Sequence, residues 1–278
     1  MWLQKLGFSD NEKVVIFHAD DIGLCQSINL SVKDLFDKNL IQSCSIIPNS
    51  GFLDHFRSLA IEEWDVGLHT NFIGSKDFGT WNPASKRYPF PVLPIDHTSE
   101  YLDAINSEIL IEEIQSQWNI LLGKGFKPTH IDTHSATVFL KTEFAMSYIQ
   151  FAIQNQIFPM VVWPKKQIGD RFGSFDYDQL TDLLNYFPYP VLDDLHTVPD
   201  VNSYEEKICS FKKIIDEIQP GITQIILHPC NSENLLNRNW DYLAILELKD
   251  YIMDQGFTLI SWKSLKDKYD SVAQSICE

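Results

Sequence analysis

The chain has 278 residues, of which 44% are hydrophobic and 22% charged, so its composition is that of an ordinary globular protein and excludes disordered and fibrous architectures. It carries 22 Lys and Arg against 38 Asp and Glu, and the formal charge of -16 argues against nucleic acids and anionic membranes as partners. We expect a small substrate that is neutral or cationic, or one whose binding depends on a metal cation.

Neither the cysteines nor the N-terminus indicates export. The five cysteines are scattered and form no C-x-x-C pair, which fits neither a disulfide framework nor a zinc ribbon. The opening segment lacks the apolar region of a signal peptide, and no apolar run reaches the ~18 residues of a membrane span. We expect a cytoplasmic protein with a single domain over residues 1–278.

Predicted strands and helices alternate along the chain. Residues 13–17 form an apolar, β-branched run typical of a strand buried on both faces, and residues 27–39 place their apolar side chains on one helical face. Further strands are predicted at 44–47, 64–68, 129–132, 158–162, 191–192, 224–227 and 257–260, and further helices at 52–61, 107–122, 143–155, 178–186, 204–218 and 242–255. Seven or eight β-α units predict an α/β fold, a TIM-like (β/α) barrel that is either complete or incomplete and distorted.

One segment, residues 73–98, interrupts this pattern. It is rich in proline and aromatic residues and has no clear periodicity. A loop of this length in a compact domain is usually functional or disordered. It is predicted to be a wall or lid over a site, or else an inert insertion packed by its own rings.

Polar residues follow four predicted strands where each strand ends. Because the strand ends of a parallel barrel meet at one face, these side chains are expected to converge. The four clusters are His18-Ala19-Asp20-Asp21, Gly67-Leu68-His69, His130-Ile131-Asp132-Thr133-His134 and Leu227-His228-Pro229.

The adjacent carboxylates of Asp20 and Asp21 favour a bound cation, which would relieve their repulsion. An isolated Asp-Asp pair would more often be a turn or a helix cap, but the other strand ends carry histidines. One carboxylate and two imidazoles suit a divalent ion and leave positions open for water and substrate. His55, His97 and His196 lack this context and are expected to be hydrogen-bonded core residues.

The four clusters resemble the YdjC/ChbG-like carbohydrate deacetylases, a family related to the polysaccharide deacetylases. The first cluster continues as Ile22-Gly23-Leu24 and matches the family pattern Asn-Ala-Asp-Asp-Phe-Gly-Leu at five of seven places, with Asn29 at a further family position. The Gly-Leu-His, Pro-Thr-His-x-Asp-Ser-His and His-Pro patterns of the family are matched at 67–69, 128–134 and 228–229. The resemblance covers residues 14–261.

The resemblance implies that Asp21, His69 and His134 hold a divalent metal ion, Mg²⁺ or Zn²⁺, with Asp20 as general base and His228 as general acid. The implied reaction is hydrolysis of the acetamido group of a small N-acetylated sugar, with the water proton going to Asp20 and His228 protonating the leaving amine. Asp132 is expected either to accept a ring proton from a ligand histidine or to point away.

Three positions depart from the family pattern. His18 replaces the usual Asn, Cys230 replaces a common Gly, and residues 135–138 stand where the family has further histidines. We expect these departures to affect substrate identity and activity.

Two alternatives remain open. One is a non-catalytic sugar-binding or regulatory protein that kept the barrel. The other is a different metal hydrolase such as a phosphoesterase, for which arginine clamps would be expected. None of Arg57, Arg87, Arg171 and Arg238 lies in the four clusters, although Arg87 and Arg171 lie on loops that could reach a site. A homodimer is compatible with the sequence.

Overall fold

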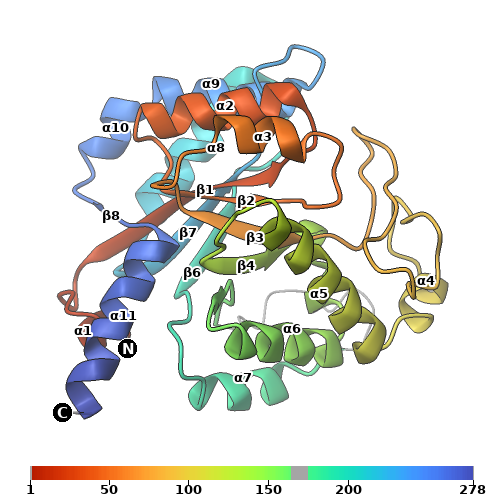
Figure 1. Ribbon diagram of the computed structural model, residues 1–278. Coiled ribbons are helices and arrows are strands. Elements are labelled where there is room, and N and C mark those ends of the chain that lie inside the picture. Colours follow the sequence, from red (N-terminus) through yellow and green to blue (C-terminus); the bar gives the residue numbers. More distant parts are fainter. Residues whose placement is uncertain (1, 164–174, 278) are drawn as a thin grey trace.

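The computed structural model describes residues 2–163 and 175–277, and in this part all paired strands form one parallel sheet (Figure 1). The strand order is β5-β4-β3-β2-β1-β7-β6, and β8 pairs with β1 beside this path. The edge strands β5 and β6 do not pair with each other. The segment after β5 meets the segment before β6 in one isolated parallel bridge, between Val162 and Leu192. The sheet is therefore a curled, incomplete barrel, as the sequence predicts.

The strands have these bounds: β1 Lys13–Ile22, β2 Ser43–Ile46, β3 Val66–Thr70, β4 His130–Thr133, β5 Phe158–Pro159, β6 Asp194–Thr197, β7 Gly221–Leu227 and β8 Thr258–Leu259. The helices are α1 Trp2–Lys5, α2 Gln26–Asp37, α3 Leu53–Leu59, α4 Ser99–Asp103, α5 Ser107–Gly123, α6 Thr142–Gln154, α7 Tyr177–Asn185, α8 Tyr204–Glu217, α9 Leu236–Glu247, α10 Lys249–Met253 and α11 Trp262–Cys277, with a 3-10 segment η1 at His134–Phe139.

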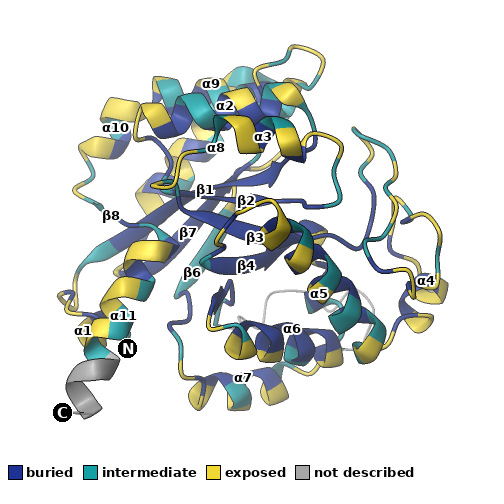
Figure 2. Cartoon of the chain, viewed as in Figure 1, coloured by how far each residue is buried: buried dark blue, intermediate teal, exposed yellow. Residues whose placement is uncertain are grey.

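Strand β1 separates two hydrophobic clusters by the alternation of its side chains. Val15 and Phe17 pack outward into the larger cluster, which also contains buried side chains of the surrounding helices. Val14 and Ile16 pack inward into a second cluster with residues of α1 and α11. Figure 2 shows the resulting pattern, with buried strands inside and exposed residues on the outer faces of the helices.

Helices surround the curled sheet on its outer face (Figure 1). In the view of Figure 1, α2, α3, α8 and α9 lie above the sheet and α5, α6 and α7 lie below it, and both groups pack against the same outer face. The two ends of the chain lie together, since the rings of Trp2 and Tyr269 are 6.0 Å apart. This arrangement leaves the carboxyl ends of the strands free to form a site.

The predicted elements are confirmed with shifts of a few residues, apart from six differences. Val191 and Leu192 do not lie in a strand, because Leu192 makes only the isolated bridge, and β6 begins at Asp194. The helix predicted at 242–255 begins at Leu236 and is divided at Leu248 into α9 and α10. Helix α11, which pairs a polar outer face with buried Trp262 and Leu265, was not predicted. The short elements α1, α4 and η1 were not predicted either.

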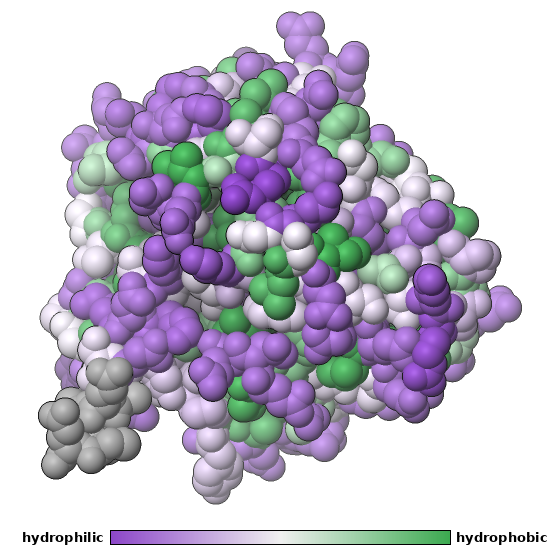
Figure 3. Space-filling model, viewed as in Figure 1, coloured by the Kyte–Doolittle hydropathy of each residue, from purple (hydrophilic) through white to green (hydrophobic). Residues whose placement is uncertain are grey.

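The surface in Figure 3 is mostly hydrophilic, with apolar side chains in separate patches. None of the helices in the described ranges has the length and apolar character that crossing a bilayer requires.

Candidate functional site

The four polar clusters meet on the concave side of the sheet, at the carboxyl ends of β1, β3, β4 and β7. On β1, His18 and Asp20 follow Val14 and Ile16 in the alternation and share their inner face. His69 lies near the end of β3, His134 directly follows β4, and His228 directly follows β7. The convergence expected from the strand ends is thus present in the structure.

The ligand atoms of Asp21, His69 and His134 all lie within 4.8 Å of one another, and the three side chains are buried. Asp21 Oδ1 is 2.8 Å from His134 Nδ1 and 3.4 Å from His69 Nε2. Ligand atoms bound to one zinc-like ion at ~2.0–2.2 Å lie about 3 Å apart, so the spacing of these atoms suits such an ion.

Asp21 reaches this position through a local distortion of β1. Regular alternation would turn Asp20 and Asp21 to opposite faces of the sheet. Asp21 instead has a φ of 69°, in the left-handed region that Asp tolerates better than most residues, and the pairing of β1 with β2 shifts register between Ala19 and Ile22. The irregularity brings both carboxylates to the site.

The second polar atoms of two of these residues are held by neighbours. His69 Nδ1 lies 2.6 Å from Asp132 Oδ1, so Asp132 points toward His69 rather than away from it. Asp21 Oδ2 accepts a hydrogen bond of 2.7 Å from Arg238 Nη2. These contacts leave His69 Nε2 and Asp21 Oδ1 facing the shared space, which is the arrangement seen around bound metals.

The charges around these groups favour their ionised forms. Burial raises the pKa of Asp21, but the charges of His134 and Arg238 outweigh this effect and hold that pKa well below its usual range. Burial lowers the pKa of His69, but the charges of Asp132 and Asp20 raise it well above its ordinary value. A cation held by His69 would have to displace a proton from it.

Asp20 and His228 lie beside the three grouped residues. Asp20 Oδ2 is 3.9 Å from His69 Nε2 and 3.9 Å from His228 Nε2. The side chain of His228 is 29% exposed, while that of Asp20 is 9% exposed. The backbone N–H of His228 donates to Asp241 Oδ2, and Asp241 is paired with the fully buried Lys207. A carboxylate and an accessible imidazole therefore flank one space.

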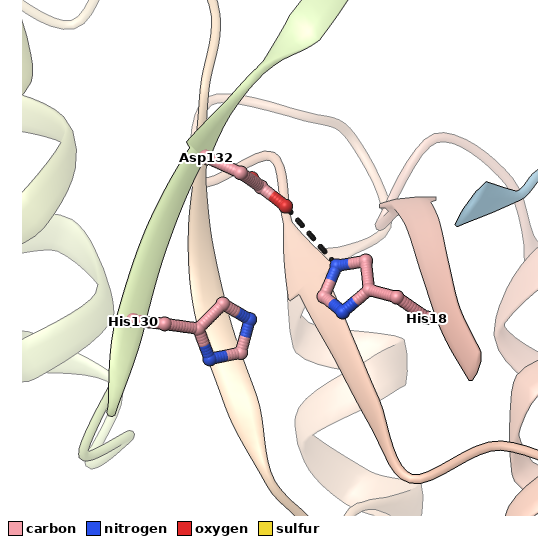
Figure 4. Close-up of side chains that lie close together, drawn as sticks. All are labelled: His18, His130 and Asp132. Atoms are coloured by element: carbon pink, nitrogen blue, oxygen red, sulfur yellow. Dashed lines mark ion pairs between the residues drawn. The ribbon is translucent and has the colours of Figure 1, made fainter. Parts of the chain in front are cut away.

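His18 lies beneath this pair and contacts two carboxylates, of which Figure 4 shows that of Asp132. Its Nε2 is 3.0 Å from Asp132 Oδ2 and 3.2 Å from Asp20 Oδ1, and its Nδ1 is 2.7 Å from the hydroxyl of Ser43. Burial lowers the pKa of His18, but the hydrogen bonds and charges of Asp132 and Asp20 raise it to about 9. A buried imidazolium thus links Asp20 to the partner of His69.

His130 faces His18 from β4 (Figure 4), and its ring needs the space left by a glycine. A Cβ on Gly67 would lie 2.3 Å from His130 Nε2. His18, His130 and Asp132 also form a group whose ligand atoms lie within 4.8 Å of one another. Since His18 Nε2 already contacts two carboxylates, we interpret this group as a support for the site above it.

A sequence profile described as YdjC-like protein matches residues 14–251 of the chain. The chain belongs to this family. A carbohydrate deacetylase from Clostridium beijerinckii is 29% identical over 267 residues, covering 90% of this chain and 99% of its own. A carbohydrate deacetylase from Brevibacillus brevis is 22% identical over 270 residues, with 90% and 99% coverage.

The fold is shared with a solved structure from Enterococcus faecalis V583, described as a proposed cellobiose-phosphate cleavage protein. The TM-score is 0.71 at 19% identity, covering 91% of this chain and 99% of the other. The incomplete barrel of this YdjC-like protein is therefore found in another solved structure.

Arg238 reaches the site, whereas Arg87 and Arg171 were the arginines expected on loops that could reach it. Arg238 lies on α9, three residues before Asp241, and its guanidinium contacts both Asp21 and Asp77. Arg87 instead pairs with Glu108 and Glu112 on the surface, and Arg171 lies outside the described residues. The strand-end argument missed Arg238 and Asp241 because both come from a helix that begins after the His-Pro cluster.

The loop predicted at 73–98 touches the site. The ring of Trp81 packs edge-on to that of His134, with centroids 6.3 Å apart, and Phe78 lies under the guanidinium of Arg238. In this YdjC-like protein the loop therefore forms a wall beside His134 and Arg238.

The other histidines lie outside the group of Asp21, His69 and His134, and two of the residues that depart from the family pattern, Ser135 and Ala136, lie beside Asp20. His97 is buried and bonds Thr137, and His55 lies 3.1 Å from the amide nitrogen of Asn29. His196, on β6, is half-buried beside Asp194. Ser135 and Ala136 have left-handed backbones and are exposed at the edge of a cavity that also borders Asp20.

Proposed function

We propose that this protein is a metal-dependent deacetylase that removes the acetyl group from an N-acetylated mono- or oligosaccharide. The observation that carries the proposal is the grouping of Asp21, His69 and His134 beside the pair Asp20 and His228. Membership of the YdjC-like family and the likeness to two proteins named carbohydrate deacetylase support it.

In this proposal Asp21 Oδ1, His69 Nε2 and His134 Nδ1 hold a divalent ion. When bound there, the ion supplies a Lewis acid that polarises the amide carbonyl and lowers the pKa of a water molecule. Two imidazoles favour Zn²⁺, and the carboxylate also accepts Mg²⁺. Asp132 fixes the orientation of His69 through Nδ1 of the ring, and Arg238 fixes that of Asp21 through Oδ2 of the carboxylate.

Asp20 acts as the general base. It is the carboxylate of the adjacent pair that is not needed as a ligand, and it lies between His69 and His228 at 3.9 Å from each. Asp20 accepts the proton of the attacking water, while His18 holds its Oδ1 from below.

His228 acts as the general acid. Expulsion of the sugar amine requires a proton, because an amine anion is a poor leaving group, and a protonated imidazole can donate one near neutral pH. Its partly exposed ring is accessible to the leaving nitrogen, and Asp241 anchors its backbone.

We place the protein in the cytoplasm and treat residues 1–278 as one domain.

Arg238 is the observation that would favour a phosphoesterase instead. Its guanidinium is already paired with Asp21 and Asp77, however, so its charge is largely compensated. A deacetylase with Arg238 as a support for Asp21 accounts better for these contacts.

The test is a screen for acetate release from N-acetylated mono- and disaccharides, with Zn²⁺ or Mg²⁺ added, for wild type and Asp20→Asn. We expect release by wild type and a fall of about 10²–10⁴ in kcat for Asp20→Asn, the range for loss of a general base. Equal release by both proteins would refute the role of Asp20. Sugar binding without turnover would favour the binding protein, and phosphate release from phosphorylated sugars would favour the phosphoesterase.

A further inference from the structure

A cavity of about 420 Å³ opens beside Asp20 and His228. Most of its lining is apolar, although Thr133, Ser135, Thr197 and Tyr177 also border it. Among the described residues around it, Asp20 and His228 are the only ones that carry a carboxylate, an imidazole or a cationic side chain. The apolar wall contains Phe139, Met160, Val162, Leu180, Leu195 and Ile226.

The position of the cavity follows from the incomplete closure of the sheet. Met160 and Val162 directly follow β5, Leu195 lies on β6, and Ile226 precedes His228 by two residues on the inner face of β7. Since β5 and β6 are the two edges of the sheet, side chains from both edges surround this space. The seam of the barrel thus becomes an apolar cavity that ends at the proposed base and acid.

A second cavity, of about 570 Å³, borders His228 and differs in chemistry. Its lining includes the polar side chains of Asp77, Asp200, Asn234, Asn237 and Arg238, which can bind hydroxyl groups. His228 and Thr197 border both cavities. An amide bond placed beside His228 for cleavage would therefore have the polar cavity on one side and the mainly apolar cavity on the other.

We propose that the apolar cavity binds the acyl group of the substrate and accepts N-acyl chains longer than acetyl, with the sugar in the polar cavity. This inference rests on the proposed function. A group the size of a water molecule needs only about 10–15 Å³ measured in the same way, so the single methyl of an acetyl group would leave most of the cavity unfilled. A sugar ring placed there instead would bury hydroxyls against apolar side chains at a cost in free energy.

The first experiment compares glucosamine carrying N-acetyl, N-butyryl or N-hexanoyl groups, with free amine measured in the presence of Zn²⁺ or Mg²⁺. Each buried methylene contributes about 0.8 kcal/mol, or about fourfold in kcat/KM. Hexanoyl has four methylenes more than acetyl, so we expect its kcat/KM to exceed that of acetyl by about 200-fold if all four are buried, and by at least tenfold if two are. A steady fall in kcat/KM from acetyl to hexanoyl would overturn the inference and leave the deacetylase proposal intact.

A binding measurement separates the two proposals if no amine appears. N-acetyl- and N-hexanoylglucosamine are titrated calorimetrically into Asp20→Asn, which keeps the apolar wall. At least tenfold tighter binding of the hexanoyl compound would support the cavity assignment even if the proposed reaction failed. Equal affinities would overturn the cavity assignment.

Two matched variants test the wall itself. Leu195→Asn places an amide on the cavity wall, whereas Leu183→Asn changes a half-buried leucine of α7 that is not among the residues lining the cavity. We expect the hexanoyl-to-acetyl ratio of kcat/KM to fall about tenfold in Leu195→Asn and to stay at the wild-type value in Leu183→Asn. Unchanged ratios in both folded variants would contradict the proposal.

Discussion

The two sides of the strand-end face differ in chemistry. Strands β1, β3 and β4 contribute a polar wall of buried carboxylates and imidazoles that contact one another closely. The seam between β5, β6 and β7 contributes an apolar wall with few polar groups. The polar wall has the groups that a hydrolytic reaction needs, and the apolar wall has the shape and chemistry that select a substrate.

The difference suggests how tolerant each wall is to substitution. Groups on the polar wall support one another, as His18 does for Asp20 and Asp132, so one change leaves a buried charge without its partner. Side chains on the apolar wall act through area and volume, so one change there leaves no buried charge without a partner. The predictions below test this contrast.

The largest effect is expected at His228, which lies where the two walls meet. His228→Asn should lower kcat/KM for amide substrates by about 10²–10⁴ and should affect an aryl acetate ester much less, because a phenol leaves without a proton. The matched control is His196→Asn, since His196 has a similar side-chain exposure of 25% and lies on the neighbouring strand. Equal losses on amide and ester would contradict the acid role.

A pH-dependent effect is expected at His18. Its folded pKa of about 9 lies above the ordinary value of 6.5, so its stabilising contribution is fully present below pH 6.5 and is lost as pH rises through about 9. The free energy of unfolding should fall by about 3 kcal/mol more in wild type than in His18→Gln across this window. Urea unfolding from pH 6 to 10 measures it, and parallel curves would disprove the buried imidazolium.

A smaller effect is expected at Arg238. Arg238→Met removes the partner of Asp21 Oδ2 and should weaken binding of the divalent ion about tenfold, the lower end for loss of such a support. Asp77→Asn, which changes the other partner of Arg238, should have little effect. Calorimetric titration with Zn²⁺ tests this, and tighter binding in Arg238→Met would mean that repulsion between the guanidinium and the ion dominates.

The last effect is expected on stability alone, at Gly67, where a side chain would meet His130. Gly67→Ala should destabilise the fold by about 1–3 kcal/mol, the usual cost of overpacking. Gly51→Ala meets no atom within 4 Å and should change stability by less than about 0.5 kcal/mol. Equal midpoints of denaturant unfolding for both variants would show that the His130 ring can move aside.

Much of the polar wall was predictable from the sequence, because strand ends in a parallel sheet share one face and the residues there are chemically distinctive. Alternation alone, however, could not place Asp21, whose position depends on a left-handed backbone and a shifted register. Arg238 and Asp241 were missed because helix α9 begins six residues earlier than predicted. The apolar wall gave no local signal, since Leu195 and Ile226 resemble any core residue until the seam brings them together.

The measurement that tests the central claim most directly is the ion content and acetate release of chelator-treated protein before and after addition of Zn²⁺ or Mg²⁺. We predict one bound ion per chain, loss of acetate release on chelation and its return with the ion, and neither ion nor activity in His134→Ala. Full acetate release by protein without a bound ion would contradict the account.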